Sequence, residues 1–303
     1  RSRGLGDVYK RQSRYYITND GFLILSSEVG VLEVPEEKIV LKERLHPGKM
    51  LLVNTVQGKV LNDEEVKEYY AKKQPYGEWL DSYLVQLKDI KIPNLPVEEY
   101  TKEERMRLQK AFGYTYEEYR SSIGKMALNG VEATASMGID TPLAVLSHEH
   151  QPLFNYFKQL FAQVTNPPID CIREEIVTST SVYVGRDGNL LEEEPKNCQV
   201  LKINNPILTN TDMLKIKNMK VEGFKAVTVP ITYYKSAPLD RAMDRLFVEV
   251  DRAHRAGANI LILSDRGVDE NHVAIPSLLA VSAVHQHLVK TVSYTHLRAH
   301  ETD

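Results

Sequence analysis

Residues 136–175 read SMGIDTPLAVLSHEHQPLFNYFKQLFAQVTNPPIDCIREE, and this stretch holds the best-formed local pattern in the chain. Residues 142–147 form a continuous apolar run of the kind that builds a buried strand. Residues 153–161 predict an amphipathic helix, because apolar side chains recur there at three- and four-residue spacing, at Phe154, Phe157, Leu160 and Phe161. Turn-forming segments at 137–142 and 164–170 enclose the pair. We therefore expect a buried strand and a packing helix, with a loop on either side.

The second of these loops is restricted by two consecutive prolines, Pro167 and Pro168. They remove two backbone donors and keep Asn166 out of helical conformation, so Thr165 and Asn166 are expected in an extended segment with unpaired carbonyls. A rigid loop of this kind could line a passage. On physical grounds alone, a stiff connector before a helix at 170–178 is the preferred interpretation.

The composition is that of a soluble protein long enough for two globular domains. The 303 residues are 42% hydrophobic and 26% charged, with a formal net charge of −3. Lysines and arginines are scattered among acids, so no nucleic-acid partner is expected. No apolar run approaches the roughly 20 residues of a membrane span, so no membrane partner is expected. Two cysteines, Cys171 and Cys198, are too few for a disulfide framework, which favours a reducing, cytoplasmic compartment.

The two ends of the chain differ from the rest. Residues 1–12, RSRGLGDVYKRQ, and residues 293–303, SYTHLRAHETD, share no periodicity with their neighbours and resemble sequencing-adapter read-through translated onto a metagenomic gene fragment. Neither segment is used to predict the fold. Two apparent motifs go with them, a glycine pair that could suggest a phosphate loop and the histidines His296 and His300 that could suggest a metal site. The natural gene is expected to continue in both directions.

From residue 14 to residue 60 the pattern is one of short strands. The turn signal Asn19-Asp20-Gly21 separates the first two strands and predicts a hairpin. The expected strands are 14–18, 22–26, 29–34, 39–41 and 50–54. A helix at 63–72 follows, with Asn62 or Asp63 as its cap. This part is expected to form a β-rich sheet edge.

A domain boundary is predicted near Pro93, in the polar, proline-punctuated run 88–99. A helix at 101–111 follows, with Thr101 as N-cap and Glu104 as its capping-box partner. A second helix is expected at 116–128, closed by Asn129-Gly130.

Beyond residue 180 the pattern becomes α/β. Residues 181–191 predict a hairpin and 199–203 a further strand, and a short helix is expected at 209–218. Strand, helix, strand and helix then follow at 226–231, 239–256, 259–263 and 277–288, which is typical of parallel strands joined by crossover helices.

The carboxyl ends of such strands carry ligands, which directs attention to Ser264, Asp265, Arg266 and Gly267. One interpretation makes Asp265 a catalytic acid. The other, which is preferred, is a capped loop with an Asp265–Arg266 pair.

Other chemically suggestive residues have simpler explanations. Cys171 follows a helix cap and could be an activated thiolate, but a buried thiol is favoured because no histidine base lies nearby in the sequence. His148 and His150 could reach one metal ion, but no third ligand has suitable spacing, so a surface turn is favoured. His285 and His287 lie two apart on a helix and face different directions. No metal site is predicted.

Two long stretches carry a family resemblance. SRYYITNDGFLILSSEVGVLEVPEEKIVLKERLHPGKMLLVNTVQGKVLNDEEVKEYYAKKQPYGEWL resembles the end of the glutamine amidotransferase domain of the glutamate synthase large subunit. SMGIDTPLAVLS and YFKQLFAQVTNPPIDCIREEIV are similar to the central domain of the same family, and the resemblance spans residues 13–292.

The resemblance implies a domain organisation and a fold class. Residues 13–93 would be the end of a β-rich, N-terminal-nucleophile amidotransferase domain, an α+β fold. Residues 94–292 would be an incomplete α/β, barrel-like central domain. The family's nucleophilic cysteine would lie upstream, so this chain would contain no catalytic residue.

In this family a tunnel carries ammonia from the amidotransferase site to the flavin site, and residues matching Met137, Thr165 and Asn166 help to line it. Ile139 stands where the family usually has an acidic residue, which leaves the role of that position open. The chain would bind no cofactor itself. The complete protein would hold FMN and a 3Fe–4S cluster and convert glutamine and 2-oxoglutarate to two glutamates.

The expected partners are the remaining domains of the same polypeptide and an electron donor, either a small subunit or ferredoxin. The cytoplasm is the expected compartment, or a plastid for a plant-type ferredoxin-dependent enzyme. Two alternatives remain. One is an independent α/β barrel enzyme that uses Asp265 and Arg266, and the other is a stand-alone interaction or ligand-binding module without glutamate synthase activity.

Overall fold

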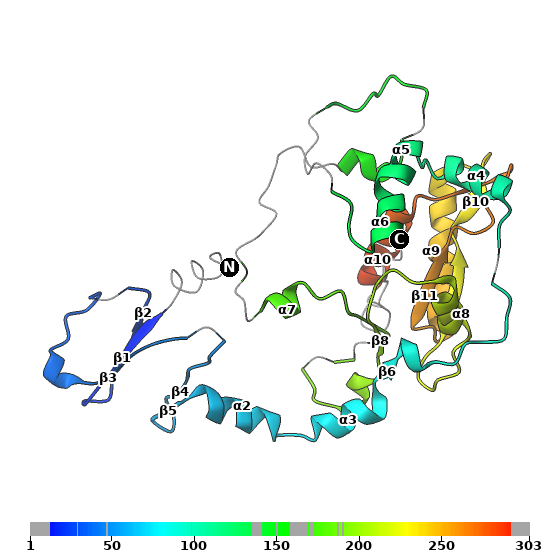
Figure 1. Cartoon of the computed structure of the whole chain (residues 1–303). Coiled ribbons are helices and arrows are strands. Elements are labelled where there is room, and N and C mark those ends of the chain that lie inside the picture. The colour runs from blue at the N-terminus through cyan, green and yellow to red at the C-terminus, as the bar shows by residue number, and fades with distance from the viewer. Residues whose placement is uncertain are drawn as a thin grey trace. The chain divides into compact units, whose positions relative to one another are not determined.

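The fold is taken from a computed structural model that describes residues 13–28, 30–46, 48–97, 99–134, 141–149, 151–157, 169, 173–186, 188–189 and 191–291. The chain divides into two compact units (Figure 1). The first contains residues 1–78 and 164–180, and the second contains residues 79–163 and 181–303. Helix α3, Tyr76–Tyr83, crosses the division at residue 78.

The first unit contains a three-stranded antiparallel sheet in the order β2-β1-β3. The predicted hairpin is confirmed, with β1 at Arg14–Thr18, β2 at Leu23–Ser26 and Gly21 at a φ of 87° in the turn. Strand β3 is Ile39–Arg44, longer than expected. The predicted strand at 29–34 is wrong for its described residues 30–34. Gly30 has a φ of 83°, which breaks an extended run at its start.

A hairpin and a helix complete the described part of this unit. Strands β4, Leu52–Asn54, and β5, Lys59–Leu61, pair antiparallel. Helix α2 is Asp63–Ala71, and its cap is Asn62, which forms a complete capping box with Glu65. The described remainder of the predicted helix 170–178 contributes α7, Glu174–Val177.

The second unit begins with a sheet built from distant parts of the chain. Its order is β6-β8-β7, with β6 at Val85–Gln86, β7 at Val182–Val184 and β8 at Leu201–Ile203. Strand β8 is parallel to β6 and antiparallel to β7. The expected hairpin at 181–191 is therefore wrong, because β7 pairs with β8 and Leu191 is exposed.

The helices after the predicted boundary match the sequence pattern. Helix α4 is Lys102–Ala111, with the predicted box between Thr101 and Glu104. Residues 116–129 are helical throughout, but they include a π-helical turn at Tyr119–Ile123 between α5, Tyr116–Glu118, and α6, Gly124–Asn129. Gly130 ends the helix at a φ of 62°, as predicted.

The buried strand predicted at 142–147 is wrong. Described residues 141–149 form turns and irregular backbone, and Val145 and Leu146 are 78% and 93% exposed. The backbone bonds to itself, since the Val145 N–H donates to Leu143 and the Ser147 N–H donates to Ala144. An apolar run does not by itself distinguish a buried strand from an irregular segment with exposed apolar side chains. The helix predicted at 153–161 is a short 3-10 helix over Leu153–Phe157, and its remaining residues lie outside the described ones.

The end of the second unit has the predicted α/β order. Strand β9 is Ala226–Pro230, helix α9 Leu239–Arg255, strand β11 Ile260–Ser264 and helix α10 Ser277–Lys290. Strands β9 and β11 pair in parallel, with Ile260 opposite Ala226 and Ser264 opposite Pro230. A small antiparallel pair lies beyond, β10 at Thr232–Tyr234 and β12 at His272–Ala274.

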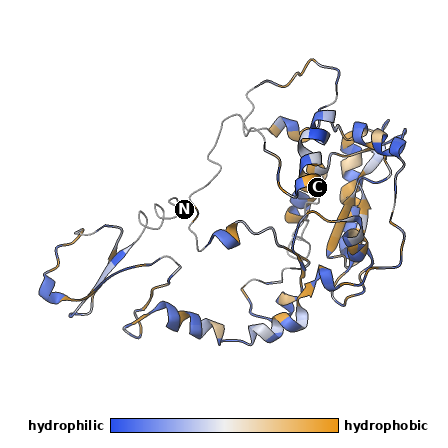
Figure 2. Ribbon diagram, viewed as in Figure 1, coloured by the Kyte–Doolittle hydropathy of each residue, from blue (hydrophilic) through white to orange (hydrophobic). Residues whose placement is uncertain are grey.

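Both faces of this parallel pair are covered, because successive side chains alternate between two cores. Val229 and Leu261 pack with Leu246, Val250, Val284 and Leu288 of α9 and α10. Ile260 and Ile262 pack with Leu201, Ile203 and Ile216, from β8 and from helix α8, Asn210–Asn218. Strand β11 is mostly hydrophobic, as its orange colour in Figure 2 shows, and β9 contributes Ala226, Val227 and Val229. The α/β character of this segment is confirmed.

None of the helices in the part of the chain that the structure describes combines the length and the apolar composition needed to cross a membrane.

Candidate functional site

A hollow of about 610 Å³ lies where β9 and β11 end, at the carboxyl edge of the parallel pair. Ser264 is the last residue of β11, and Asp265 and Arg266 follow it directly. Gly267 makes the turn away from the strand with a φ of 97°, a conformation that residues with a side chain rarely adopt. The structure thus places the predicted residues Ser264, Asp265 and Arg266 on the wall of one hollow.

One face of α8 forms another wall of the hollow. Its lining residues recur at three- and four-residue spacing, Asn210, Met213, Leu214 and Lys217. Thr228, Pro230 and Ile262 add one face of the strands, and Pro96 and Val97 add part of the linker before α4. The hollow therefore combines an apolar floor with a few polar side chains, the usual make-up of a small-molecule site.

Arg266 joins three segments that are far apart in the sequence. Its Nη1 donates to the hydroxyl oxygen of Tyr100 at 2.7 Å, and its Nη2 donates to Asn210 Oδ1 at 3.1 Å. The guanidinium also lies over the Tyr100 ring, 5.7 Å from its centre. Tyr100 and Asn210 are thus two of the partners of Arg266, and the Asp265–Arg266 pair expected from the sequence stays a prediction. The linker and α8 are tied to the end of β11.

The loop that follows Arg266 is held by Asp269. Its Oδ1 accepts the N–H groups of Asn271 and His272 at 2.7 and 2.8 Å. The backbone N–H of Asn271, followed by the His272 side chain, lowers the pKa of Asp269 below its usual range. The Asp269 carboxylate therefore stabilises a turn, and Asp269 is not one of the residues that line the hollow of 610 Å³.

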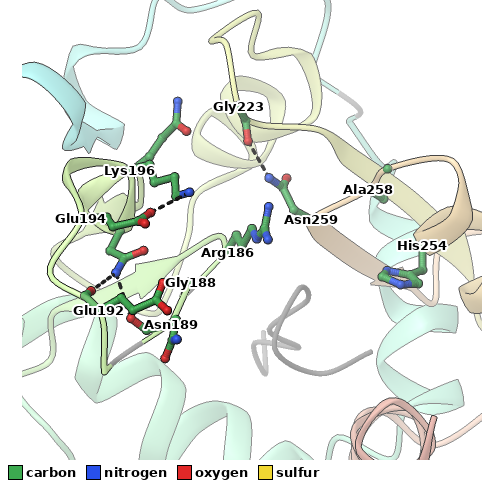
Figure 3. Close-up of a pocket in the computed structure, with 13 residues that line it drawn as sticks. Arg186, Gly188, Asn189, Glu192, Glu194, Lys196, Gly223, His254, Ala258 and Asn259 are labelled. Atoms are coloured by element: carbon green, nitrogen blue, oxygen red, sulfur yellow. Dashed lines mark hydrogen bonds and ion pairs between the residues drawn. The ribbon is translucent and has the colours of Figure 1, made fainter. Parts of the chain in front are cut away.

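A second hollow, of about 480 Å³, lies at the opposite, amino ends of the same strands (Figure 3). Its charged side chains are of both signs, and Lys196 pairs with Glu194 at 2.6 Å. Asn259 donates to the Gly223 carbonyl at 2.6 Å and accepts from the Lys225 N–H at 2.8 Å. These contacts hold loops to the start of β11, so we assign this hollow a structural role.

Several of the sequence-predicted site residues lie outside the described residues. These are Met137, Thr165, Asn166, Ile139, Cys171, His150, His296 and His300. His148 is among the described residues and is exposed. His287 of α10 contacts Asp251 of α9, with 2.8 Å between Nε2 and Oδ1, and its ring stacks on Phe247 at 4.5 Å.

The described residues contain no group of three or more histidine, cysteine or acidic side chains placed to hold a metal ion.

Asp63, in the first unit, is a buried carboxylate with several hydrogen-bond partners. The sequence did not predict this role. The Asp63 carboxylate accepts from Lys67 Nζ at 2.9 Å, Lys49 Nζ at 3.0 Å and the Met50 N–H at 3.0 Å. The hydrogen bond from Lys67, with those from Lys49 and Met50, lowers the pKa of Asp63 from 3.8 to about 2. The four-residue spacing between Asp63 and Lys67 is visible in the sequence. The contacts of Asp63 with Lys49 and Met50 depend on the tertiary fold.

Comparison with known families gives two matches on this chain. Residues 107–299 match the model described as the glutamate synthase central domain, and residues 9–79 match that of the class-II glutamine amidotransferases.

Three relatives illustrate the similarity. The chain is 44% identical over 284 residues to the glutamate synthase [NADPH] large chain of Bacillus subtilis, and 39% identical over 286 residues to ferredoxin-dependent glutamate synthase 2 of Synechocystis. It is 38% identical over 293 residues to glutamate synthase [NADH] of Schizosaccharomyces pombe. Each comparison covers 92% of this chain but only 18%, 18% and 14% of the relative. The chain thus spans less than a fifth of the length of these proteins.

Proposed function

Because the chain belongs to the glutamate synthase central domain family, we propose that it is the part of a glutamate synthase large subunit that joins the amidotransferase domain to the central domain. The observation that carries this proposal is the order of the two matches. An amidotransferase segment at 9–79 precedes a central-domain segment at 107–299 on one chain. A stand-alone α/β module is not favoured, because both segments match glutamate synthases over 92% of the chain.

The domain boundary is proposed near Pro93, with residues 13–93 in the amidotransferase domain and 94–292 in the central domain. Pro93 lies in the gap between the two family matches, which supports this choice. The central domain is further proposed to be barrel-like. The parallel pairing of β9 with β11, each followed by a short strand and then a helix, supports that proposal.

In the complete protein the proposed reaction converts glutamine and 2-oxoglutarate to two glutamates, with FMN and a 3Fe–4S cluster as cofactors. Iron–sulfur clusters are held by several cysteine thiolates, and this chain has two cysteines, Cys171 and Cys198. The residues of this chain therefore do not fit the cluster, which the proposal assigns to the rest of the polypeptide. Neither half of the reaction takes place on residues of this chain.

The electron donor differs among the relatives, whose names include NADPH, NADH and ferredoxin. Accordingly the proposed partner is either a pyridine-nucleotide-dependent small subunit or ferredoxin. The proposed compartment is the cytoplasm, with a plastid as the alternative for a ferredoxin-dependent plant enzyme.

The role proposed for this segment is to line a conduit that carries ammonia between the two active sites. The residues proposed to line it are Met137, Thr165 and Asn166. Support comes from the family match, which includes all three positions, and from the consecutive prolines that stiffen the loop.

The test uses the complete enzyme with a bulky side chain in the conduit, Thr165→Phe. We expect glutamine-dependent glutamate formation to fall while ammonia-dependent formation is retained, because added ammonia reaches the second site without the conduit. Thr178→Phe, at the exposed end of α7, is the control and is expected to change neither rate. An equal loss of both activities in Thr165→Phe would disprove the conduit role.

A further inference from the structure

The connector between the two family matches is joined to the second unit by a short strand. The first match ends at residue 79 and the second begins at residue 107, so residues 80–106 belong to neither. Within this connector, β6 lies beside β8 in parallel orientation (Figure 1), and the Val85 N–H donates to the Val200 carbonyl at 3.1 Å. The connector is therefore partly a strand of a folded sheet.

One buried side chain anchors this strand. Leu87, which follows β6 directly, is 7% exposed and belongs to the same hydrophobic core as Leu201 of β8 and Ile216 of α8. Among the residues of 79–157 that the structure describes, Leu87 is the one hydrophobic side chain that is buried. The attachment of this stretch to the core therefore depends mainly on Leu87.

The backbone of Leu87 is held by Lys215 of α8. The Lys215 side chain is buried, and its Nζ donates to the Leu87 carbonyl oxygen at 3.3 Å. The carboxylate of Asp212, three residues earlier in α8, lies 4.0 Å from the same Nζ. Lysine is rarely buried, because its ammonium group loses hydration that hydrogen bonds and a counter-charge must replace. A buried lysine that binds this carbonyl indicates a specific contact between α8 and the segment that follows β6.

We propose that residues 85–90 form a latch, which docks the connector on β8 and the buried side of α8 and can open while the rest of the second unit stays folded. A segment with one buried side chain has few contacts to lose, so its opening costs less free energy than unfolding of the whole core. The latch rests on the proposed function in one respect, because it is there that the connector joins two domains. Opening of the latch lengthens the free chain between the amidotransferase and central domains.

Hydrogen exchange of the full chain, measured by mass spectrometry, tests the latch. Leu87→Ala removes most of the anchoring side chain. We expect the amides of residues 85–90 to exchange about 100-fold faster, up to the rate of an unprotected amide, as for the loss of a buried leucine. Leu95→Ala is the matched control, because Leu95 lies in the same connector but is 49% exposed, and it should leave residues 85–90 unchanged.

A second variant shows whether the latch opens by itself. Val284 of α10 is fully buried in the other core, to which Leu87 does not belong. Val284→Ala should speed exchange in β9 and β11 about tenfold and leave residues 85–90 unchanged, because opening of the latch does not expose Val284. If Leu87→Ala fails to fold, as a thermal melt would reveal, Leu87→Val removes one methylene group and should speed exchange at 85–90 about fivefold.

Three results would overturn the latch. Exchange at residues 85–90 could be unchanged in the Leu87 variants, or Leu95→Ala could speed it as much as Leu87→Ala does. It could also rise in Val284→Ala as much as exchange in β9 and β11, which would mean that the segment opens only when the whole unit unfolds. Exchange is measured without turnover, so a failed latch leaves the proposed glutamate synthase role intact, and a failed conduit test leaves the latch intact.

Discussion

Asp63 is a single buried carboxylate that ties the start of α2 to the preceding turn, through Lys49, Lys67 and the Met50 N–H. Its pKa is about 2 in the folded chain against 3.8 ordinarily, so the group stabilises the fold above pH 4. That contribution is lost as the pH falls from about 4 towards 2, because the folded carboxylate then takes up a proton and loses its charged partners.

We predict that Asp63→Asn lowers the melting temperature at pH 6 and that the difference from the wild type shrinks as the pH falls towards 2. Thermal unfolding of both proteins across this pH range is the measurement. Glu64→Gln, an exposed carboxylate in the same helical turn, is the control and should have little effect. A difference between Asp63→Asn and the wild type that stays constant from pH 6 to pH 2 would contradict the assignment.

Single residues were predictable from the sequence where their partners are local. The Thr101–Glu104 capping box and the choice of Asn62 or Asp63 as cap both follow from spacings of a few residues. Arg266 was singled out by its place after a strand, but its partners, Tyr100 and Asn210, lie 166 and 56 residues away. No local pattern encodes such pairs, because only the tertiary fold brings them together.

At the scale of one element, the helix at 116–129 contains a π-helical turn that depends on Gly124. A Cβ at Gly124 would lie 3.0 Å from the Tyr119 carbonyl oxygen, closer than van der Waals contact allows. An alanine in a helix normally stabilises it by about 0.5–1 kcal/mol relative to glycine. Here the crowding should cancel or reverse that gain.

We therefore predict that Gly124→Ala leaves the free energy of unfolding unchanged or lowers it by about 1 kcal/mol. Gly77→Ala is the control, since Gly77 is a helical glycine in α3 whose Cβ would meet no atom within 4 Å. Urea unfolding measures both variants. If Gly124→Ala proved as stabilising as Gly77→Ala, the π-helical turn would not constrain the position.

The linker before α4 is a second element, and Tyr100 in it contacts Arg266. Tyr100→Phe removes the hydroxyl oxygen bonded to Arg266 but keeps the ring beneath the guanidinium. The expected loss is about 1 kcal/mol, which corresponds to about fivefold faster hydrogen exchange of nearby linker amides.

Exchange measured by mass spectrometry tests this prediction. Tyr114→Phe, at an exposed tyrosine after α4, serves as the control. Unchanged exchange of the linker in Tyr100→Phe would mean that other contacts hold the segment.

Among the elements, periodicity predicted the long helices and the order of β9, α9, β11 and α10 because each has a strong local pattern. Strand pairing was harder. The sequence suggested that β7 pairs with the residues that follow it, whereas β7 lies against β8, some twenty residues further along the chain. The apolar run at 142–147 was also wrongly predicted to be a buried strand, since its exposed residues Val145 and Leu146 form a turn.

At the scale of the whole molecule, the two units differ in how much apolar surface they bury. Among the described residues of the first unit, the buried hydrophobic side chains are Tyr15 and Val66. The other buried hydrophobic residues that the structure describes lie in the second unit. Phe22, just before β2, and Val40, in β3, are 66% and 68% exposed. A sheet that buries few apolar side chains gains little stability from a core, and its exposed apolar residues form a surface prone to association.

This surface leads to a prediction about the chain in solution. We expect it to self-associate through the sheet, because β3 is an edge strand and Val40 lies exposed on it. Val40→Ser should shift the sedimentation profile towards monomer without lowering the melting temperature, since an exposed side chain adds little to the core. Leu146→Ser changes an equally apolar and 93% exposed residue in a loop of the second unit, and it should leave the profile unchanged. If Val40→Ser and Leu146→Ser shifted the sedimentation profile equally, association would follow from general surface hydrophobicity. The sheet of the first unit would then not be a specific association surface.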